Sequence, residues 1–89
     1  MSPLRRLMYF EKDGCAPCKE LRPVAEAIAV ETDLPIEFVN VNGDNGLEHA
    51  IAYKVKAAPT LIVIGDKGER LGGMVGKMIS LSRTLLLIK

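Results

Sequence analysis

The chain has 89 residues, of which 48% are apolar and 26% are charged, the composition of one small folded domain rather than of a disordered segment. Its 12 basic and 11 acidic residues leave a formal net charge of +1 and are scattered along the sequence. This balance gives no concentrated positive field, so neither nucleic acid nor an anionic membrane is expected as a partner.

The first predicted element is a buried strand from Leu4 to Phe10, a short apolar run that ends in a charged loop over residues 11–14. The segment from Met1 to Phe10 has too few apolar residues for a signal-peptide core, and no run in the chain approaches the length of a membrane span. We therefore expect the protein to stay in the cytoplasm.

A pair of cysteines follows this loop in the segment Cys15-Ala16-Pro17-Cys18. Apolar residues recur after it at helical spacing, which predicts a helix from about Cys15 to Glu31 with both sulfur atoms on one face of the first turn. Free N–H groups and the positive end of the helix dipole favour thiolate over thiol at such a position. We expect Cys15 to be the nucleophilic thiolate, and Pro17 to make the first turn rigid without disturbing the helix.

The pair allows other interpretations. A disulfide across three residues closes so small a loop that a purely stabilising role is poorly motivated. Half of a zinc site is a second alternative, for which His49 is the only other soft ligand, with no further cysteine or second histidine. In a reducing cytoplasm a Cys-x-x-Cys pair is more often catalytic than structural. Redox chemistry is the first hypothesis, and a metal or cluster carrier and a non-catalytic adaptor stay open.

The middle of the chain predicts a second strand and a second helix. Pro23 removes one hydrogen bond from the first helix, so a kink is expected there. Ile36 to Val41 alternates as a β-branched strand, residues 42–46 form the strongest turn cluster of the sequence, and Leu47 to Tyr53 is predicted to be a short helix.

The last part of the chain predicts a hairpin and a final helix. Leu61 to Ile64 is a continuous apolar run, as in a central strand covered on both faces, and a short turn joins it to an antiparallel strand over Glu69 to Met74. We expect the glycines at 72, 73 and 76 to leave the sheet edge. Lys77 to Lys89 is predicted to be a helix, and its helically spaced apolar stripe should pack on the sheet: Met78, Leu81, Leu85 and Ile88.

The order strand, helix, strand, helix, strand, strand, helix, with the cysteine pair opening the first helix, resembles the thioredoxin family. The matching positions are Cys15 to Lys19, Pro23, Val55, Pro59-Thr60-Leu61, Gly68-Glu69 and Gly76. The resemblance implies an α/β protein with a minimal thioredoxin fold, in which helices cover both faces of a central four-stranded mixed sheet. It also implies that residues 1–89 form a single domain.

The resemblance further implies a thiol-disulfide oxidoreductase, either a protein disulfide reductase or an electron donor. Cys15 would attack a substrate disulfide, and Cys18 would resolve the mixed disulfide. Pro59 is implied to be a cis-proline that faces the disulfide and presents backbone groups to the substrate. The small, uncharged residues expected to form the substrate surface are Gly14, Ala16, Pro17, Ala58, Pro59 and Gly73.

Partners and cofactors follow from the same resemblance. The expected partners are disulfide-containing protein substrates and an upstream reductase or glutathione. The protein itself is expected to be a monomer that needs no metal and no cofactor beyond its own cysteine pair. Gly72-Gly73 is similar to the diglycine of glutaredoxins, which makes a glutathione-dependent glutaredoxin-like enzyme the alternative, although these glycines lie farther beyond Pro59 than in typical glutaredoxins.

Two residues depart from the thioredoxin pattern. Gly14 stands where thioredoxins place a tryptophan, and the chain contains no tryptophan, so partner choice should differ. Tyr9 stands where the family buries a carboxylate beneath the second cysteine, and a phenol with a pKa of about 10 is a poor general base at neutral pH. The sequence therefore leaves the proton acceptor for Cys18 unassigned.

Overall fold

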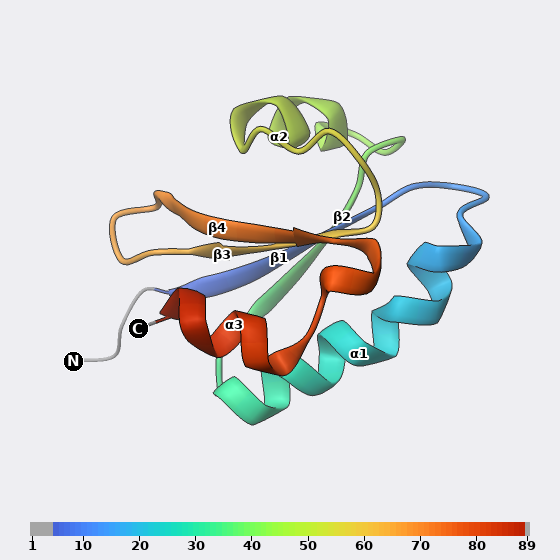
Figure 1. Cartoon of the computed structure of the whole chain (residues 1–89). Helices are drawn as coiled ribbons and strands as arrows, with labels where there is room; N and C mark the ends of the chain where they lie inside the picture. The colour runs from blue at the N-terminus through green and yellow to red at the C-terminus, as the bar shows by residue number, and fades with distance from the viewer. Residues whose placement is uncertain (1–4, 89) are drawn as a thin grey trace.

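Residues 5–88 are described by a computed structural model, in which one four-stranded mixed sheet is flanked by three α-helices (Figure 1). The elements follow the order β1 (Arg6–Glu11), α1 (Ala16–Thr32), β2 (Ile36–Asn40), α2 (Gly46–Ala52), β3 (Thr60–Ile64), β4 (Arg70–Val75), the 3-10 turn η1 (Gly76–Met78) and α3 (Leu81–Ile88). The predicted order of strands and helices is confirmed. Leu4 and Lys89, the outer ends of the first predicted strand and the last predicted helix, lie outside the described residues.

The strands lie in the order β2-β1-β3-β4. β1 pairs parallel with β2 and antiparallel with β3, and β3 pairs antiparallel with β4. β3 is an interior strand and all five of its residues are buried, as its unbroken apolar run predicted. The hairpin between β3 and β4 is also confirmed.

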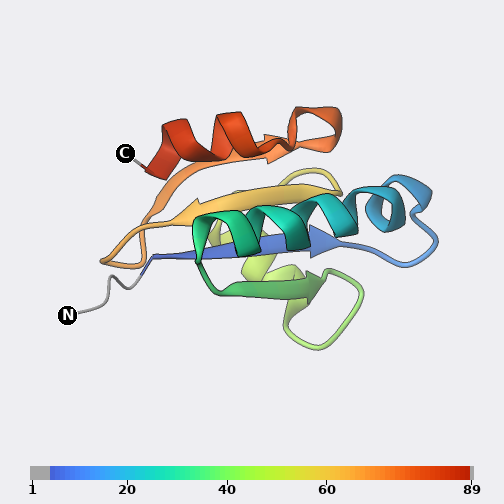
Figure 2. The same cartoon turned by 90° about the horizontal axis from the view of Figure 1, so that it is seen from below.

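Helices cover both faces of the sheet. α2 packs on one face, and α1 and α3 pack side by side on the other, as the two views show (Figures 1 and 2). Side chains of β1 alternate accordingly: Leu7 and Tyr9 belong to the core under α1, whereas Met8 and Phe10 belong to the core under α2. The fold therefore has two apolar cores, one on each side of the sheet.

Helix α1 begins immediately after Cys15, which is its N-cap residue, and it continues through Pro23 as one helix to Thr32. Pro17 lies in the first turn, where the missing N–H has no helical partner to lose. The predicted start and end of this helix agree with the structure within one residue.

The expectation that Gly72 and Gly73 leave the sheet edge is wrong. Both lie within β4, paired with Val63 and Ile62 of β3. At Gly72 the nearest atom to an added Cβ would be a Leu87 methyl carbon at 2.5 Å. Because Gly72 carries no side chain, Leu87 of α3 packs directly over it within the strand.

The predicted stripe of the last helix is confirmed only at Ile88. α3 starts at Leu81, because the Ser80 hydroxyl accepts the Arg83 N–H as a helix cap, and residues 76–78 form a separate 3-10 turn. Thr84 is fully buried, and Leu87 and Ile88 pack against the core, whereas 45% of Leu85 is exposed. Leu85 of the predicted stripe is therefore on the exposed side of α3, and Met78 lies outside this helix, in the 3-10 turn.

Candidate active site

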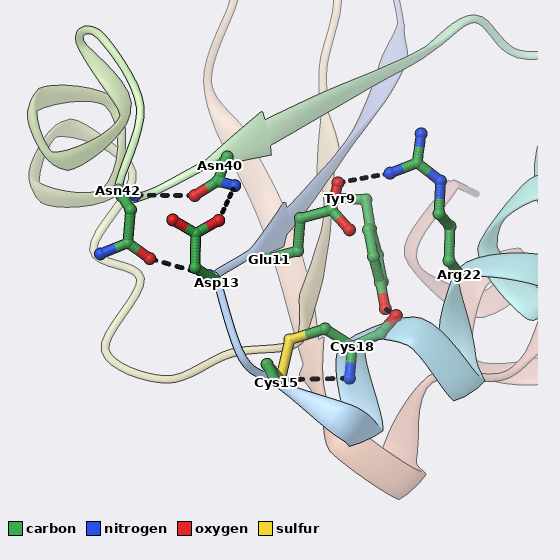
Figure 3. A network of polar contacts seen from close by, with 8 residues as sticks. All are labelled: Tyr9, Glu11, Asp13, Cys15, Cys18, Arg22, Asn40 and Asn42. Atoms are coloured by element: carbon green, nitrogen blue, oxygen red, sulfur yellow. Dashed lines mark hydrogen bonds and ion pairs between the residues drawn. A yellow bond between two sulfur atoms is a disulfide. The ribbon is translucent and has the colours of Figure 1, made fainter.

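Cys15 and Cys18 form a disulfide at the start of α1, with their Cα atoms 5.2 Å apart (Figure 3). As the N-cap residue, Cys15 has an extended backbone, and its Sγ accepts the Cys18 backbone N–H at 3.1 Å. Cys15 is 5% exposed and Cys18 is 1% exposed. The first cysteine is therefore the more accessible residue of the pair, and its Sγ faces a donor group of the helix end.

The Ala58–Pro59 peptide bond is cis, which is the isomer that the family resemblance implied. Pro59 directly precedes β3, and Thr60 of β3 pairs with Phe10 near the end of β1. The segment that leaves β1 toward Cys15 and the segment that enters β3 at Pro59 therefore lie at the same end of these two strands. This placement brings the proline segment to the end of the molecule that carries the disulfide.

Two hydrogen bonds hold the proline segment. The Thr60 hydroxyl donates to the Ala57 carbonyl at 2.7 Å, and the Gly76 N–H donates to the Pro59 carbonyl at 2.9 Å. Gly76 has a φ of +54°, a left-handed backbone that glycine adopts without strain. Gly76 is a position that matches the family pattern, and its place beside Pro59 was not predicted from the sequence.

Tyr9 lies beneath the disulfide, and its hydroxyl donates to the Cys18 carbonyl at 2.7 Å (Figure 3). The ring is fully buried and meets Phe38 edge to face at 5.8 Å between centroids. Burial raises the pKa of Tyr9 to about 12, the Glu11 carboxylate acts in the same direction, and the Arg22 guanidinium opposes this increase. Tyr9 is therefore a neutral hydrogen-bond donor at neutral pH and no proton acceptor for Cys18.

An ion pair flanks this tyrosine. Arg22 of α1 donates to Glu11 at 2.5 Å, and its guanidinium carbon lies 3.9 Å from the centre of the Phe38 ring. The pair links the end of β1 to α1 next to the buried phenol. The Glu11 carboxylate is engaged by Arg22 and lies at the end of β1 rather than in the helix that carries the cysteines.

The loop before Cys15 is tied to the end of β2 by a set of polar contacts that sequence reasoning missed (Figure 3). The Asn40 amide donates to the Asp13 carboxylate at 2.8 Å, and the Asp13 N–H donates to the Asn42 side chain at 2.8 Å. The signal available in the sequence was the parallel pairing of β1 and β2, which brings their carboxyl ends to one edge. These contacts fix the loop that delivers Cys15 to the helix.

The predicted substrate-surface residues fall into two groups. Gly14, Ala16 and Pro17 are exposed around the disulfide, and Ala58 is half-buried beside Pro59. Gly14 has a φ of +68°, and nothing lies within 4 Å of a Cβ built there. Gly73 lies within β4, three residues along the strand from Gly76, a separation of about 10 Å at about 3.3 Å per residue. The structure therefore brings Gly76, rather than Gly73, to Pro59.

Between residues 5 and 88, no three or more histidine, cysteine, aspartate or glutamate side chains gather in a geometry that would hold a metal ion. Within the same residues, no helix has both the length and the apolar character needed to cross a membrane.

Comparison with known proteins gives consistent matches. The thioredoxin family model matches residues 4–85. Thioredoxin of Porphyra purpurea is 34% identical over 70 residues, covering 79% of this chain and 64% of that protein, so the chain spans less than two thirds of this relative. Thioredoxin 1 of Nostoc sp. strain PCC 7120 is 35% identical over 81 residues, covering 89% of this chain and 75% of its own.

Solved structures agree with these sequence matches. A single-site mutant of thioredoxin from Halobacterium salinarum superposes with a TM-score of 0.76 at 34% identity, covering 94% of this chain and 71% of that structure. Thioredoxin 1 of Thermosipho africanus superposes with a TM-score of 0.71 at 27% identity, covering 92% of this chain and 88% of that structure.

Proposed function

The chain belongs to the thioredoxin family, and on that premise we propose that it is a thiol-disulfide oxidoreductase acting through Cys15 and Cys18. The observation that carries the proposal is the hydrogen bond from the Cys18 N–H to the Cys15 sulfur at the N-terminus of α1. In the reduced protein the same N–H and the positive helix end stabilise a Cys15 thiolate. The protein then serves as a protein disulfide reductase or an electron donor.

The proposed reaction has two exchange steps. The Cys15 thiolate attacks one sulfur of a substrate disulfide, which forms a mixed disulfide and releases the first substrate thiolate. Cys18 loses its proton and attacks the Cys15 sulfur, which releases the second substrate thiolate and closes the Cys15–Cys18 disulfide. Two electrons pass from the protein dithiol to the substrate, and an upstream donor then reduces the protein disulfide.

The proposed substrate surface surrounds these sulfur atoms. Gly14, Ala16 and Pro17 lie on the α1 side of the disulfide, and Ala58 and Pro59 lie on the β3 side. Their small, uncharged side chains leave room for the backbone of a protein substrate. Gly76 joins this surface in place of Gly73, because its N–H is bonded to the Pro59 carbonyl.

The wider context of the reaction is part of the same proposal. Residues 1–89 act as one monomeric domain in the cytoplasm, where reducing conditions keep a reactive cysteine pair available. Disulfide-containing proteins are the substrates, and a reductase supplies the electrons. The proposed reaction involves no nucleic acid, membrane or metal. Glutathione is the alternative electron source, and its only sequence support, Gly72-Gly73, now lies within β4.

Equilibration of the Cys15–Cys18 couple with dithiothreitol and glutathione buffers tests the proposal. A reducing role predicts a two-electron couple near about −270 mV, and a value near about −120 mV would contradict that role. Cys18→Ser should trap the mixed disulfide with a substrate, whereas Cys15→Ser should form none. Failure of the pair to form an intramolecular disulfide would reject the oxidoreductase and favour the carrier or adaptor. Turnover with a thioredoxin reductase or with glutathione alone identifies the electron source.

A further inference from the structure

A pocket of about 210 Å³ opens beside the segment that leads into Pro59. Its lining comes from α2, from the segment between α2 and β3, and from the residues that follow β1 and β2. Figure 1 shows that α2 covers this face of the sheet. Most of its lining is apolar and two lysines complete it; the residues that matter here are Val41, Leu47, Val55, Ala58, Lys12 and Lys56. Because Ala58 belongs both to the pocket and to the cis peptide bond, the pocket adjoins the proposed substrate surface.

The size and lining of the pocket favour a side chain of a protein over a free small molecule. Small-molecule sites usually enclose about 300–1,000 Å³ and bury most of their ligand. This pocket is smaller and open to solvent, and Leu47 in its lining is 63% exposed. An apolar side chain that enters it would cover exposed leucine and alanine surface and gain the free energy of apolar burial.

The charge at this pocket is unbalanced. Lys12 and Lys56 come from different segments, both are exposed, and neither forms an ion pair among residues 5–88. The carboxylates on either side of Lys12 are engaged elsewhere, Glu11 by Arg22 and Asp13 by Asn40.

Acidic side chains of the neighbouring segment do not correct this imbalance. Asp44 and Glu48 lie in the turn before α2 and in its first turn, and neither lines the pocket. The pocket therefore presents two positive charges around an apolar floor.

We propose that this pocket receives an apolar side chain from an acidic segment of a protein substrate, with Lys12 and Lys56 pairing with carboxylates beside that side chain. The inference rests on the proposed oxidoreductase function and adds the substrate class that it prefers. Complementary charge raises the association rate and selects partners more than it adds raw affinity, so the preference should appear in the rate of substrate reduction.

The test compares reduced wild-type protein with the double variant Lys12→Glu, Lys56→Glu. Two peptides with one intramolecular disulfide serve as substrates, identical except that the leucine near the disulfide is flanked by glutamates in one and by lysines in the other. A small neutral disulfide, hydroxyethyl disulfide, measures the exchange chemistry without the pocket. Lys67→Glu is the matched control, because Lys67 lies in the exposed turn after β3, at the far end of the strand from Pro59.

Wild-type protein and Lys67→Glu should reduce the acidic peptide about three- to tenfold faster than the basic peptide, the size expected for two exposed charge pairs. This preference should weaken as salt rises from about 0.05 M to about 0.5 M, and the double variant should lose or reverse it. The rate with hydroxyethyl disulfide is measured for each protein, and the peptide rates of that protein are divided by it, so that a change in Cys15 reactivity does not count as a change in peptide preference.

Equal rates for both peptides with the wild-type protein would overturn the inference and leave the oxidoreductase intact. A concentration-dependent dimer that the double variant abolishes would also overturn it, since a second copy of the chain would then occupy the pocket. Failure of the wild-type protein to reduce any of the three disulfides would instead reject the proposed function and this inference with it.

Discussion

Replacing Tyr9 with phenylalanine removes one hydroxyl from a fully buried ring and leaves the aromatic contact with Phe38 in place. The hydroxyl donates to the Cys18 carbonyl at 2.7 Å. A buried hydrogen bond of this kind contributes about 1 kcal/mol to stability. The Tyr9→Phe variant should therefore be less stable than the wild type by about 1 kcal/mol at neutral pH.

At alkaline pH the difference between the two proteins should disappear. Burial raises the pKa of Tyr9 to about 12 in the folded protein, whereas an unfolded tyrosine ionises near a pKa of about 10. Because the folded pKa is the higher one, the contribution of Tyr9 to stability is complete below about pH 10 and is lost as pH rises toward about 12. The loss amounts to about 1.4 kcal/mol at about pH 11, so the two proteins should be about equally stable there.

Chemical denaturation of the oxidised proteins between about pH 8 and about pH 11 measures this convergence. The variant is the control for lysines and other groups that titrate in the same range. The chain has two tyrosines and no tryptophan, so the difference in phenolate absorbance between the proteins reports Tyr9 alone. A constant stability difference across this range, or titration of Tyr9 near about pH 10, would refute the buried-donor role.

Two further predictions concern the segments on either side of the site. Gly46→Ala should destabilise the protein by about 3 kcal/mol or more, because the new Cβ would lie 1.9 Å from the backbone oxygen of Asn40. Gly43→Ala is the control, since its Cβ would lie 3.3 Å from the same atom. Equal thermal stability of the two variants would contradict the clash. Thr60→Val should cost about 1 kcal/mol in denaturant unfolding by removing the donor to the Ala57 carbonyl, and Thr60→Ser should restore that stability if the hydroxyl is responsible.

The elements that the sequence predicted best are those whose local pattern and burial agree. Leu61 to Ile64 has no polar position, and such a short run next to a turn cluster is typical of an interior strand covered on both faces. The start of α1 was equally clear, because the residues before it are turn formers and Pro17 is favoured in a first turn, where its missing N–H breaks no helical hydrogen bond. In both cases the local signal was strong enough to set the position without tertiary information.

The errors arose where tertiary contacts decide the local structure. Gly72 was expected to leave the sheet edge, yet it lies within β4, and the Leu87 side chain occupies the space that a Cβ would need. The face of α3 was predicted poorly because apolar residues occur on both of its sides: Leu85 is exposed, whereas Leu87 packs against the core. Gly76 was visible as a motif residue, but its bond to Pro59 requires the hairpin register.

Tyr9 was identified from the sequence, but its contact required the structure. Its role matters because Cys18 must lose a proton in the proposed reaction. The sequence showed that a phenol replaces the expected carboxylate, and the structure adds that this phenol is a donor to the Cys18 carbonyl. A phenol whose pKa is raised to about 12 is neutral and accepts no proton at neutral pH. The proton of Cys18 therefore leaves by a route that does not pass through Tyr9.

This conclusion predicts the pH profile of the resolving step. The rate at which the mixed disulfide is resolved can be measured by rapid quenching of a Cys15 adduct. This rate should rise with pH in the same way in wild-type protein and in Tyr9→Phe, because Tyr9 takes no part in the proton transfer. A uniform change in rate at all pH values is compatible with the hydroxyl positioning Cys18. If the pH dependence itself shifts or disappears in the variant, Tyr9 takes part in the proton transfer, and the assignment of a donor without a basic role is wrong.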